Sequence, residues 1–188
     1  MIKVNLCCGK TDFGPTWISI DKGNFPHIKY KDVTKLPFED NSIDLEYCSH
    51  GIAYFNRFEI IPVLKEWYNK LKPGGVLRIS TTDWDRLLYI YKKRGAELKN
   101  LLGPLFGLIT INNENLYHKT VYNFKELKEL LLSIGFKKIR HWSWKKIDPH
   151  RTIDDQSRAY FPKKPELYKS GKFTKDQVMI SLNIEAIK

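Results

Sequence analysis

The sequence contains few cysteines and no long hydrophobic run. Its 188 residues include three cysteines, Cys7, Cys8 and Cys48, and an odd number with two adjacent does not make a disulfide framework. No CxxC pair and no cysteine–histidine cluster at zinc spacing is present, so we expect free buried thiols and no metal. No stretch approaches the ~18 apolar residues of a membrane span, and Met1–Asn5 lacks the layout of a signal peptide. We therefore expect a soluble, cytoplasmic protein.

The composition is that of a folded globular chain. Hydrophobic residues make up 42% and aromatic residues 13%, which excludes disorder, collagen and coiled coil as descriptions of the whole chain. No internal repeat or linker is visible. A chain of 188 residues most simply forms one domain, 1–188, which buries roughly 70% of its unfolded surface.

The chain is strongly basic. It has 32 Lys+Arg against 21 Asp+Glu, a formal charge of +11. This excess favours anionic partners such as nucleic acid, phosphorylated molecules, nucleotide-linked sugars or acidic membranes, although lysine-rich surfaces often serve only solvation. The longest basic runs are pairs or triplets such as Lys92-Lys93-Arg94, which is weaker than a nucleic-acid-binding tail.

Short apolar runs alternate with helical patterns along the chain. An amphipathic stripe predicts a helix over 56–71, where Pro62 either kinks the helix or lies in its first turn. Further helical segments are expected over 84–102, interrupted by Gly95, and over 124–133, whereas 103–123 looks irregular. This order indicates an α/β sheet of parallel strands, with the last two strands antiparallel at one edge and a long connection, 145–175, between them. The expected strands cover 2–6, 17–20, 28–30, 43–48, 76–80, 137–144 and 179–187.

Ligands of open α/β sheets bind beyond the carboxyl ends of the strands. This rule selects Cys7–Gly9, Asp21, Asp32, Ser49-His50 and Thr81–Asp83. A glycine after the first strand lets backbone approach a ligand, but the segment matches neither GxGxxG nor a phosphate loop. Asp21 could accept both hydroxyls of an adenosine ribose and Asp32 the exocyclic amine of adenine, although each could equally be a turn or cap residue.

Four phrases together carry a family resemblance: VNLCCG (4–9), WISID (17–21), DVTKLPFEDNSIDLEYCSHGIAYF (32–55) and LKEWYNKLKPGGVLRIS (64–80). With them the sequence resembles a class I S-adenosylmethionine-dependent methyltransferase of the short, methyltransferase type 11-like group. The resemblance implies a Rossmann-like fold with a seven-stranded, mostly parallel sheet, an antiparallel last strand and helices on both faces. It also implies S-adenosylmethionine bound across the carboxyl edge.

The same resemblance implies roles for individual residues. The loop Leu6, Cys7, Cys8 and Gly9 would pass under the methionine part of the cofactor. Asp21 would bind the ribose and Asp32 the adenine, which Val33 and Leu36 could cover. Ser49 and His50 would lie near the methionine end and the substrate.

Two departures from the family pattern stand out. The family usually has glycine where Cys7 stands, and a side chain there could crowd the loop. Members also commonly read HVLEHF where this chain reads His50-Gly51-Ile52-Ala53-Tyr54-Phe55, so no role of that Glu and second His carries over. The helices that usually precede the first strand are missing, which leaves the cofactor less covered or marks a domain of a longer protein.

Methyl transfer is an in-line attack on a sulfonium methyl, and an oxygen nucleophile usually needs a base. His118 is the first candidate because 103–123 could fold over the site as a lid; Asp83 and His50 follow. Asp83 and Asp85 could hold a cation, but no third ligand is visible. Stacking on an acceptor could come from Trp84, Trp142, Trp144, Tyr160 and Phe161, and phosphate binding from Arg151, Arg158, Lys163 and Lys164.

Three functions remain open from the sequence. The first is O-methylation of a small-molecule or glycan acceptor, in keeping with a basic surface and an anionic substrate. The second is methylation of RNA or another nucleic acid, against which strand four ends in Cys48-Ser49-His50-Gly51 rather than an NPPY-like motif. The third is a cofactor-binding module without turnover. The sequence does not indicate an oligomeric state.

Overall fold

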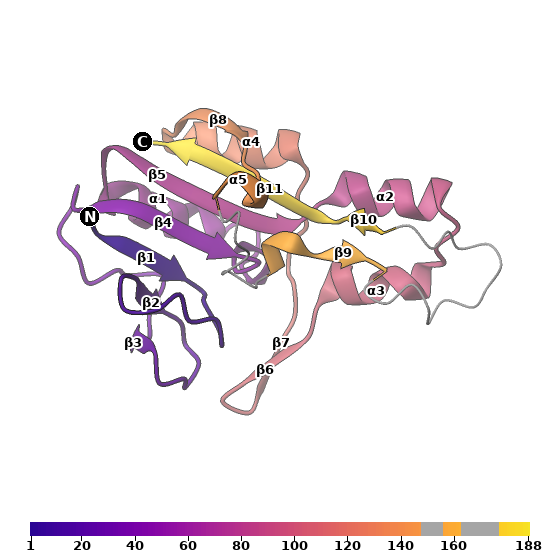
Figure 1. Ribbon diagram of the computed structural model, residues 1–188, viewed down its shortest axis with the longest axis horizontal. Coiled ribbons are helices and arrows are strands. Elements are labelled where there is room, and N and C mark those ends of the chain that lie inside the picture. The colour runs from indigo at the N-terminus through magenta and orange to yellow at the C-terminus, as the bar shows by residue number, and fades with distance from the viewer. Residues whose placement is uncertain (148–155, 163–176) are drawn as a thin grey trace.

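A seven-stranded sheet with the order β3-β2-β1-β4-β5-β11-β8 forms the centre of the protein (Figure 1). The computed structural model describes residues 1–147, 156–162 and 177–188. Strands β1 to β5 are parallel, and β11 runs antiparallel to both β5 and β8. This topology confirms the predicted fold. The strands are β1 (Lys3–Leu6), β2 (Ile18–Ile20), β3 (Ile28–Tyr30), β4 (Ile43–Ser49), β5 (Leu71–Thr82), β8 (Lys137–His141) and β11 (Ser181–Ile187).

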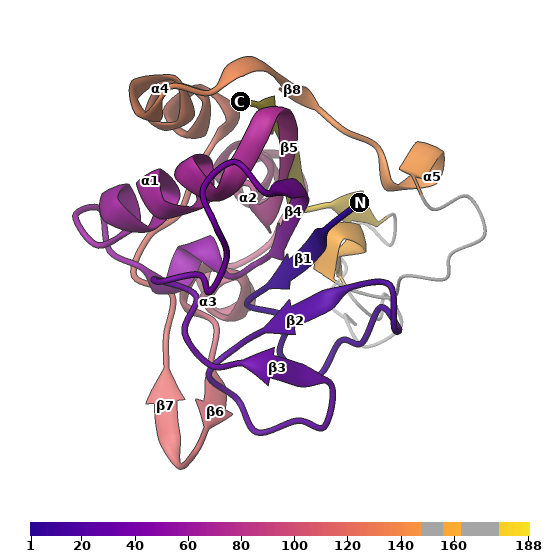
Figure 2. The same ribbon diagram turned by 90° about the vertical axis from the view of Figure 1, so that its left-hand side faces the viewer.

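Two helices, α1 (Ile60–Lys70) and α4 (Phe124–Ile134), cover one face of the sheet (Figure 2). Each places leucines and aromatic residues on the side that faces the strands, and Leu64, Trp67, Leu127 and Leu131 are fully buried there. Helix α1 begins at Ile60, so Pro62 falls in its first turn, where the missing N–H removes no intrahelical bond.

The opposite face of the sheet is polar. Because side chains alternate along strands, Asn5, Arg78, Asn183 and Glu185 all point to this side. The buried Glu185 carboxylate binds Arg78 Nε at 2.7 Å and Arg140 Nη2 at 2.7 Å. A short helix α5 (Trp144–Ile147) and the 3₁₀ turn η2 (Gln156–Arg158) lie on this side, together with edge-to-face rings of Phe13, Trp17, Tyr47 and Trp142.

A second, smaller core lies beyond the carboxyl ends of the strands. Helices α2 (Trp84–Lys93) and α3 (Leu98–Phe106) pack there with strands β9 (Tyr160–Phe161) and β10 (Val178–Met179) (Figure 1). Their buried side chains form a cluster separate from the main core: Leu87, Ile90, Ala96, Leu101, Phe161 and Ile180.

The structure agrees with the prediction for 84–102 and corrects the prediction for 103–123. The helical stretch over 84–102 is interrupted at Gly95 as expected, since Gly95 turns the chain at φ 72°. The stretch expected to be irregular continues α3 to Phe106 and then forms a hairpin of β6 (Ile109–Ile111) and β7 (Glu114–Leu116). Asn112 and Asn113 both have positive φ, 51° and 65°, which is the backbone of a two-residue hairpin turn.

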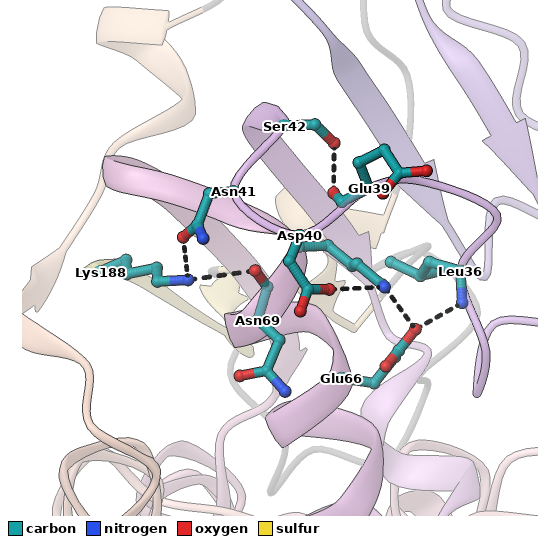
Figure 3. Close-up of polar contacts among 9 residues, drawn as sticks. Leu36, Glu39, Asp40, Asn41, Ser42, Glu66, Asn69 and Lys188 are labelled. Carbon is teal, nitrogen blue, oxygen red and sulfur yellow. Dashed lines mark hydrogen bonds and ion pairs between the residues drawn. The ribbon is translucent and has the colours of Figure 1, made fainter.

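The end of the sheet away from the carboxyl edge is tied by polar contacts (Figure 3). Lys70 Nζ binds Asp40 Oδ1 at 2.7 Å, and Glu66 Oε1 accepts the Leu36 N–H at 2.9 Å. Lys188 Nζ donates to Asn41 Oδ1 at 2.8 Å and to the Asn69 carbonyl at 3.1 Å. These bonds join the end of α1 to the loop before β4 and to the last residue. Of the helices that the structure describes, none is long and apolar enough to cross a membrane.

Glu46, in the middle of β4, is fully buried on the face that α1 covers. Neither of its carboxylate oxygens has a hydrogen-bond partner among the described residues. Burial raises the pKa of Glu46 well above its usual value, with small contributions from Cys48 and Glu66 and an opposing one from Lys188. The fold therefore favours the protonated carboxyl.

A pH series of unfolding experiments tests this assignment. The pKa of Glu46 is raised in the folded protein. Its contribution to the free energy of unfolding is therefore present at low pH and is lost progressively as pH rises above the pKa of an unfolded glutamate, about 4.3, and through the folded pKa. Glu46→Gln carries no such proton, so we expect it to be more stable than the parent at pH 8 by about 1–3 kcal/mol. The exposed Glu39→Gln is the control and should behave like the parent. A Glu46→Gln variant that is less stable than the parent at pH 8 would contradict the assignment.

Candidate functional site

Asp21 holds together the two loops that follow β1 and β2. It comes directly after β2 and only 6% of it is exposed. Its Oδ2 accepts the Gly9 N–H at 3.0 Å and its Oδ1 accepts the Gly23 N–H at 2.6 Å. The carboxylate thus fixes the backbone of both loops, and each oxygen retains a further lone pair for a ligand.

Gly9 presents open backbone at this edge. It has φ 53°, and a Cβ built there would meet nothing within 4 Å. Cys8, just before it, points away from this space, with Sγ 3.8 Å from His27 Nε2. A ligand can therefore approach the backbone at Gly9 closely, next to the Asp21 carboxylate.

Cys7 directs its side chain inward, toward the end of β4. It has φ 53°, a left-handed conformation, and its N–H donates to the Ile20 carbonyl at 2.9 Å. A Cβ built on Gly51 would lie 2.6 Å from Cys7 Sγ and 2.7 Å from Cys48 Sγ. The contact with Cys48 and burial raise the pKa of the Cys7 thiol, so Cys7 remains a protonated packing group.

The segment after β3 divides into an exposed and a buried part. Asp32 is exposed and accepts bonds from Thr34 N at 2.7 Å and Thr34 Oγ1 at 2.6 Å, which lower its pKa. The Val33 carbonyl accepts a hydrogen bond from Trp67 Nε1 at 2.8 Å. Leu36 is 3% exposed and belongs to the main core. Asp32 is thus available to a ligand, whereas Leu36 packs beneath the loop.

Ser49 and His50 end β4 at the same edge. The Ser49 hydroxyl is buried and has no hydrogen-bond partner among the residues that the structure describes. His50 has φ 55°, and its Nε2 lies 3.4 Å from Ser181 Oγ on β11. A buried hydroxyl without a partner at the end of β4 fits a ligand that supplies one.

His118 lies between the end of α3 and Tyr54. Its N–H donates to the Phe106 carbonyl at 2.7 Å and its Nδ1 to the Leu105 carbonyl at 3.1 Å, so α3 holds the ring. The ring packs edge-on against Tyr54, 4.9 Å between centroids. The next residue anchors the segment on the turn η1 (Ile52–Tyr54), because Lys119 N donates to the Ala53 carbonyl at 2.7 Å.

The protonation state of His118 follows from these contacts. Burial lowers its pKa, so the imidazole is neutral at pH 7. With Nδ1 donating to Leu105, Nε2 carries the free lone pair. Gly107, at φ 52°, has no side chain to crowd that atom. A Cβ built on Gly107 would lie 2.8 Å from Nε2.

Asp83 has an evident structural role. It follows β5 and caps α2, accepting the Asp85 N–H at 3.0 Å, and its other oxygen lies 4.0 Å from Arg86 Nε. Burial raises its pKa. No group of three or more potential metal ligands occurs within 1–147, 156–162 and 177–188, so Asp83 and Asp85 lack a third ligand there.

The β6–β7 hairpin reaches over to β2 and was missed by sequence reasoning. Glu114 Oε2 binds Lys22 Nζ at 2.7 Å, and Asn112 Nδ2 donates to the Lys22 carbonyl at 3.1 Å. Lys22 directly follows Asp21, so the hairpin spans the carboxyl edge like the predicted lid. The Asn112-Asn113 pair between two short apolar runs could have indicated it.

The predicted aromatic residues lie in different parts of the fold. Trp84 begins α2 just after β5 and is 39% exposed, whereas Trp142 and Trp144 lie on the polar face of the sheet, where Arg158 sits over the Trp144 ring at 5.3 Å. Tyr160 lies in β9, and Phe161 is buried in the smaller core. Arg151, Lys163 and Lys164 lie outside the described residues.

Comparisons with known proteins agree with this fold. Residues 10–79 match the family model of a methyltransferase domain. A Staphylococcus aureus demethylmenaquinone methyltransferase is 29% identical over 140 residues, which cover 69% of this chain and 57% of the relative. The solved S-adenosylmethionine-dependent methyltransferase of Archaeoglobus fulgidus has a TM-score of 0.57 and 15% identity, covering 99% of this chain and 85% of that one. A second, from Methanosarcina mazei, has a TM-score of 0.54 and 16% identity, with 99% and 91% covered.

The chain has the Rossmann-like fold of class I methyltransferases. Its residues 10–79 resemble the methyltransferase domain family. The cofactor that these likenesses imply is S-adenosylmethionine. The chain spans 57% of the length of the curated relatives that it matches.

The methyltransferase resemblance gives meaning to the contact between Cys7 and Gly51. The family pattern usually has glycine at the position of Cys7 and valine at that of Gly51. In this protein the large and the small residue are exchanged, and the Cys7 side chain fills the space that a residue at 51 would use. Cys7 therefore packs into the fold and does not crowd the open side at Gly9.

Reciprocal substitutions test this exchange. Gly51→Val alone should lower the free energy of unfolding by about 3 kcal/mol, because its Cβ would overlap Cys7. Adding Cys7→Gly should recover at least about 1 kcal/mol of that loss, measured in a double-mutant cycle by urea denaturation. Cys8→Ala, whose side chain points toward His27, is the matched second substitution and should recover nothing. Additive effects of Cys7→Gly and Gly51→Val would refute the exchange.

Proposed function

We propose that this chain transfers the methyl group of S-adenosylmethionine to an oxygen of a small-molecule acceptor. The proposal is supported by a neutral, oriented imidazole, His118, which α3 and Tyr54 hold beyond the carboxyl ends of the strands. At the same edge of the sheet Gly9 leaves open backbone and Asp21 supplies a carboxylate. The curated relative is named for a small molecule, demethylmenaquinone, which favours a small acceptor over RNA.

Residues of the edge would hold the cofactor. Asp21 would bind the ribose hydroxyls and Asp32 the adenine amine, while the open backbone at Gly9 would lie against the methionine part. Their chemistry fits, because carboxylates accept bonds from hydroxyls and amines and glycine admits a close ligand. When bound, the cofactor supplies an electrophilic methyl on a sulfonium, and the protein supplies position.

His118 would be the base. Its Nδ1 is engaged by Leu105, so Nε2 would take the proton from an acceptor hydroxyl as that oxygen attacks the methyl. Tyr54 and Gly107 would act as positioning residues, the first packing on the ring and the second keeping Nε2 accessible. Asp83 and His50 remain weaker candidates, because Asp83 caps α2 and His50 faces Ser181.

The nature of the acceptor is part of the proposal. A phenol-like or quinol hydroxyl and a sugar hydroxyl both suit a single histidine base. The three free thiols suit a reducing, cytoplasmic compartment.

Calorimetry with S-adenosylmethionine and S-adenosylhomocysteine tests the cofactor site. We expect both to bind, and Asp32→Ala to weaken binding about tenfold, because a hydrogen bond to a charged group contributes about 1.5 kcal/mol. Asp40→Ala, an exposed aspartate at the opposite end of the sheet, should bind like the parent. If neither ligand binds the parent, the proposed function is wrong.

Rate measurements test the base. His118→Ala should lower the methyl-transfer rate by about 10²- to 10⁴-fold without changing cofactor affinity. The parent rate should rise with pH to a plateau whose midpoint lies below the ordinary histidine pKa of about 6.5, since burial lowers the pKa of His118. His141→Ala, an exposed histidine on β8, is the control.

The assay offers quinols, phenols, sugars and RNA in parallel. If RNA is the sole methylated acceptor, the proposal of a small-molecule acceptor is wrong. If the rate of His118→Ala equals that of the parent, His118 is not the base.

A further inference from the structure

Helix α3 exposes a row of large apolar side chains. Leu98, Leu102 and Phe106 recur every four residues on one side of the helix, with exposed fractions of 60%, 44% and 55%. Leu108 and Ile109 continue the row toward the hairpin, 57% and 37% exposed. Single exposed leucines are ordinary, but a contiguous row of this kind marks an interaction surface.

The inner side of the same helix is already occupied. Leu101 is buried in the smaller core and Leu105 packs against it. The helix is therefore apolar on two sides, and packing among residues 1–147, 156–162 and 177–188 accounts for one of them. We call the outer row, Leu98, Leu102, Phe106, Leu108 and Ile109, the α3 face.

Cations border the α3 face. Helix α2 ends in Lys92 and Lys93, both exposed, and Arg94 follows in the turn that leads into α3. Lys99 lies within α3 itself, with its side chain 72% exposed. Residues 84–109 contain five Lys/Arg and two Asp/Glu. Apolar side chains bordered by basic ones match an anionic lipid surface, which binds both kinds of group.

The α3 face lies behind the proposed base. The backbone carbonyls of Leu105 and Phe106 hold His118, and the hairpin that follows crosses to Lys22 beside Asp21. In Figure 1, α2 and α3 form the end of the molecule beyond the carboxyl edge of the sheet. A surface that binds α3 would therefore lie close to the site.

We propose that the α3 face docks on an anionic membrane surface, with Lys92, Lys93 and Lys99 meeting lipid phosphates and the leucines and Phe106 entering the interface. One consequence rests on the proposed function: the acceptor would be a molecule that partitions into the bilayer and reaches His118 from it.

Vesicle sedimentation without cofactor tests the docking. We expect the parent to bind vesicles of phosphatidylcholine containing about one third phosphatidylglycerol, to bind pure phosphatidylcholine far more weakly, and to be released as salt is raised. Leu102→Glu should weaken binding about tenfold or more, because it removes a leucine that would enter the lipid interface and adds a negative charge that the anionic lipids repel. The double variant Lys92→Glu/Lys93→Glu should weaken it similarly while leaving the apolar row intact.

The matched control is Leu132→Glu, a leucine 50% exposed on α4, which should bind like the parent. Circular dichroism would confirm that each variant is folded. Absence of binding by the parent, or equal binding by folded Leu102→Glu, would overturn the proposal. So would a parent dimer that Leu102→Glu dissociates without any vesicle binding, since a second copy would then cover the face. Because no cofactor or turnover enters this measurement, its failure is distinct from a failure of methyl transfer.

Discussion

The site depends on one constraint, the burial of a single apolar sheet face beneath α1 and α4. Because β1 to β5 are parallel, burying that face places all their carboxyl ends at one edge. Asp21 then connects two of the loops at that edge through the Gly9 and Gly23 amides. The packing of α1 and α4 on that face thus sets the positions of the candidate ligand-binding groups at the carboxyl edge.

The opposite face of the sheet is covered, among the described residues, by the short helix α5 and the turn η2. The strands carry polar side chains there, and Glu185 pairs with both Arg78 and Arg140 on that side. Aromatic rings from the loop after β1 and from the segment after β8 pack on part of it. The tryptophans that could have stacked on an acceptor contribute to this packing instead.

Helix α3 combines three tasks. One side completes the smaller core with Leu101, its carbonyls orient His118, and its outer side presents an apolar row with lysines beside it. This arrangement places His118 against the same helix that carries the outer apolar row. It also explains why so apolar a segment lies at the surface of a protein whose charge is +11.

Sequence patterns located most of the strands, α1, α4 and the residues at the strand ends, because periodicity and turn residues are local properties. They located the break at Gly95 but failed over 103–123, where the hairpin turns at Asn112 and Asn113, since that turn depends on backbone conformations with positive φ. They also left Cys7 and Gly51 as two unrelated departures from the family pattern. These residues are far apart in sequence and meet only when β1 and β4 pair.

The sequence by itself therefore determined the sheet, its edge and the family resemblance, all of which rest on local patterns and their order. Only the tertiary structure decided that Leu36 belongs to the core, that Asp83 is a helix cap, and that the carbonyl of Leu105 holds the ring of His118. The physical reason is that burial and hydrogen-bond partners are set by residues distant in sequence, and no local pattern contains them.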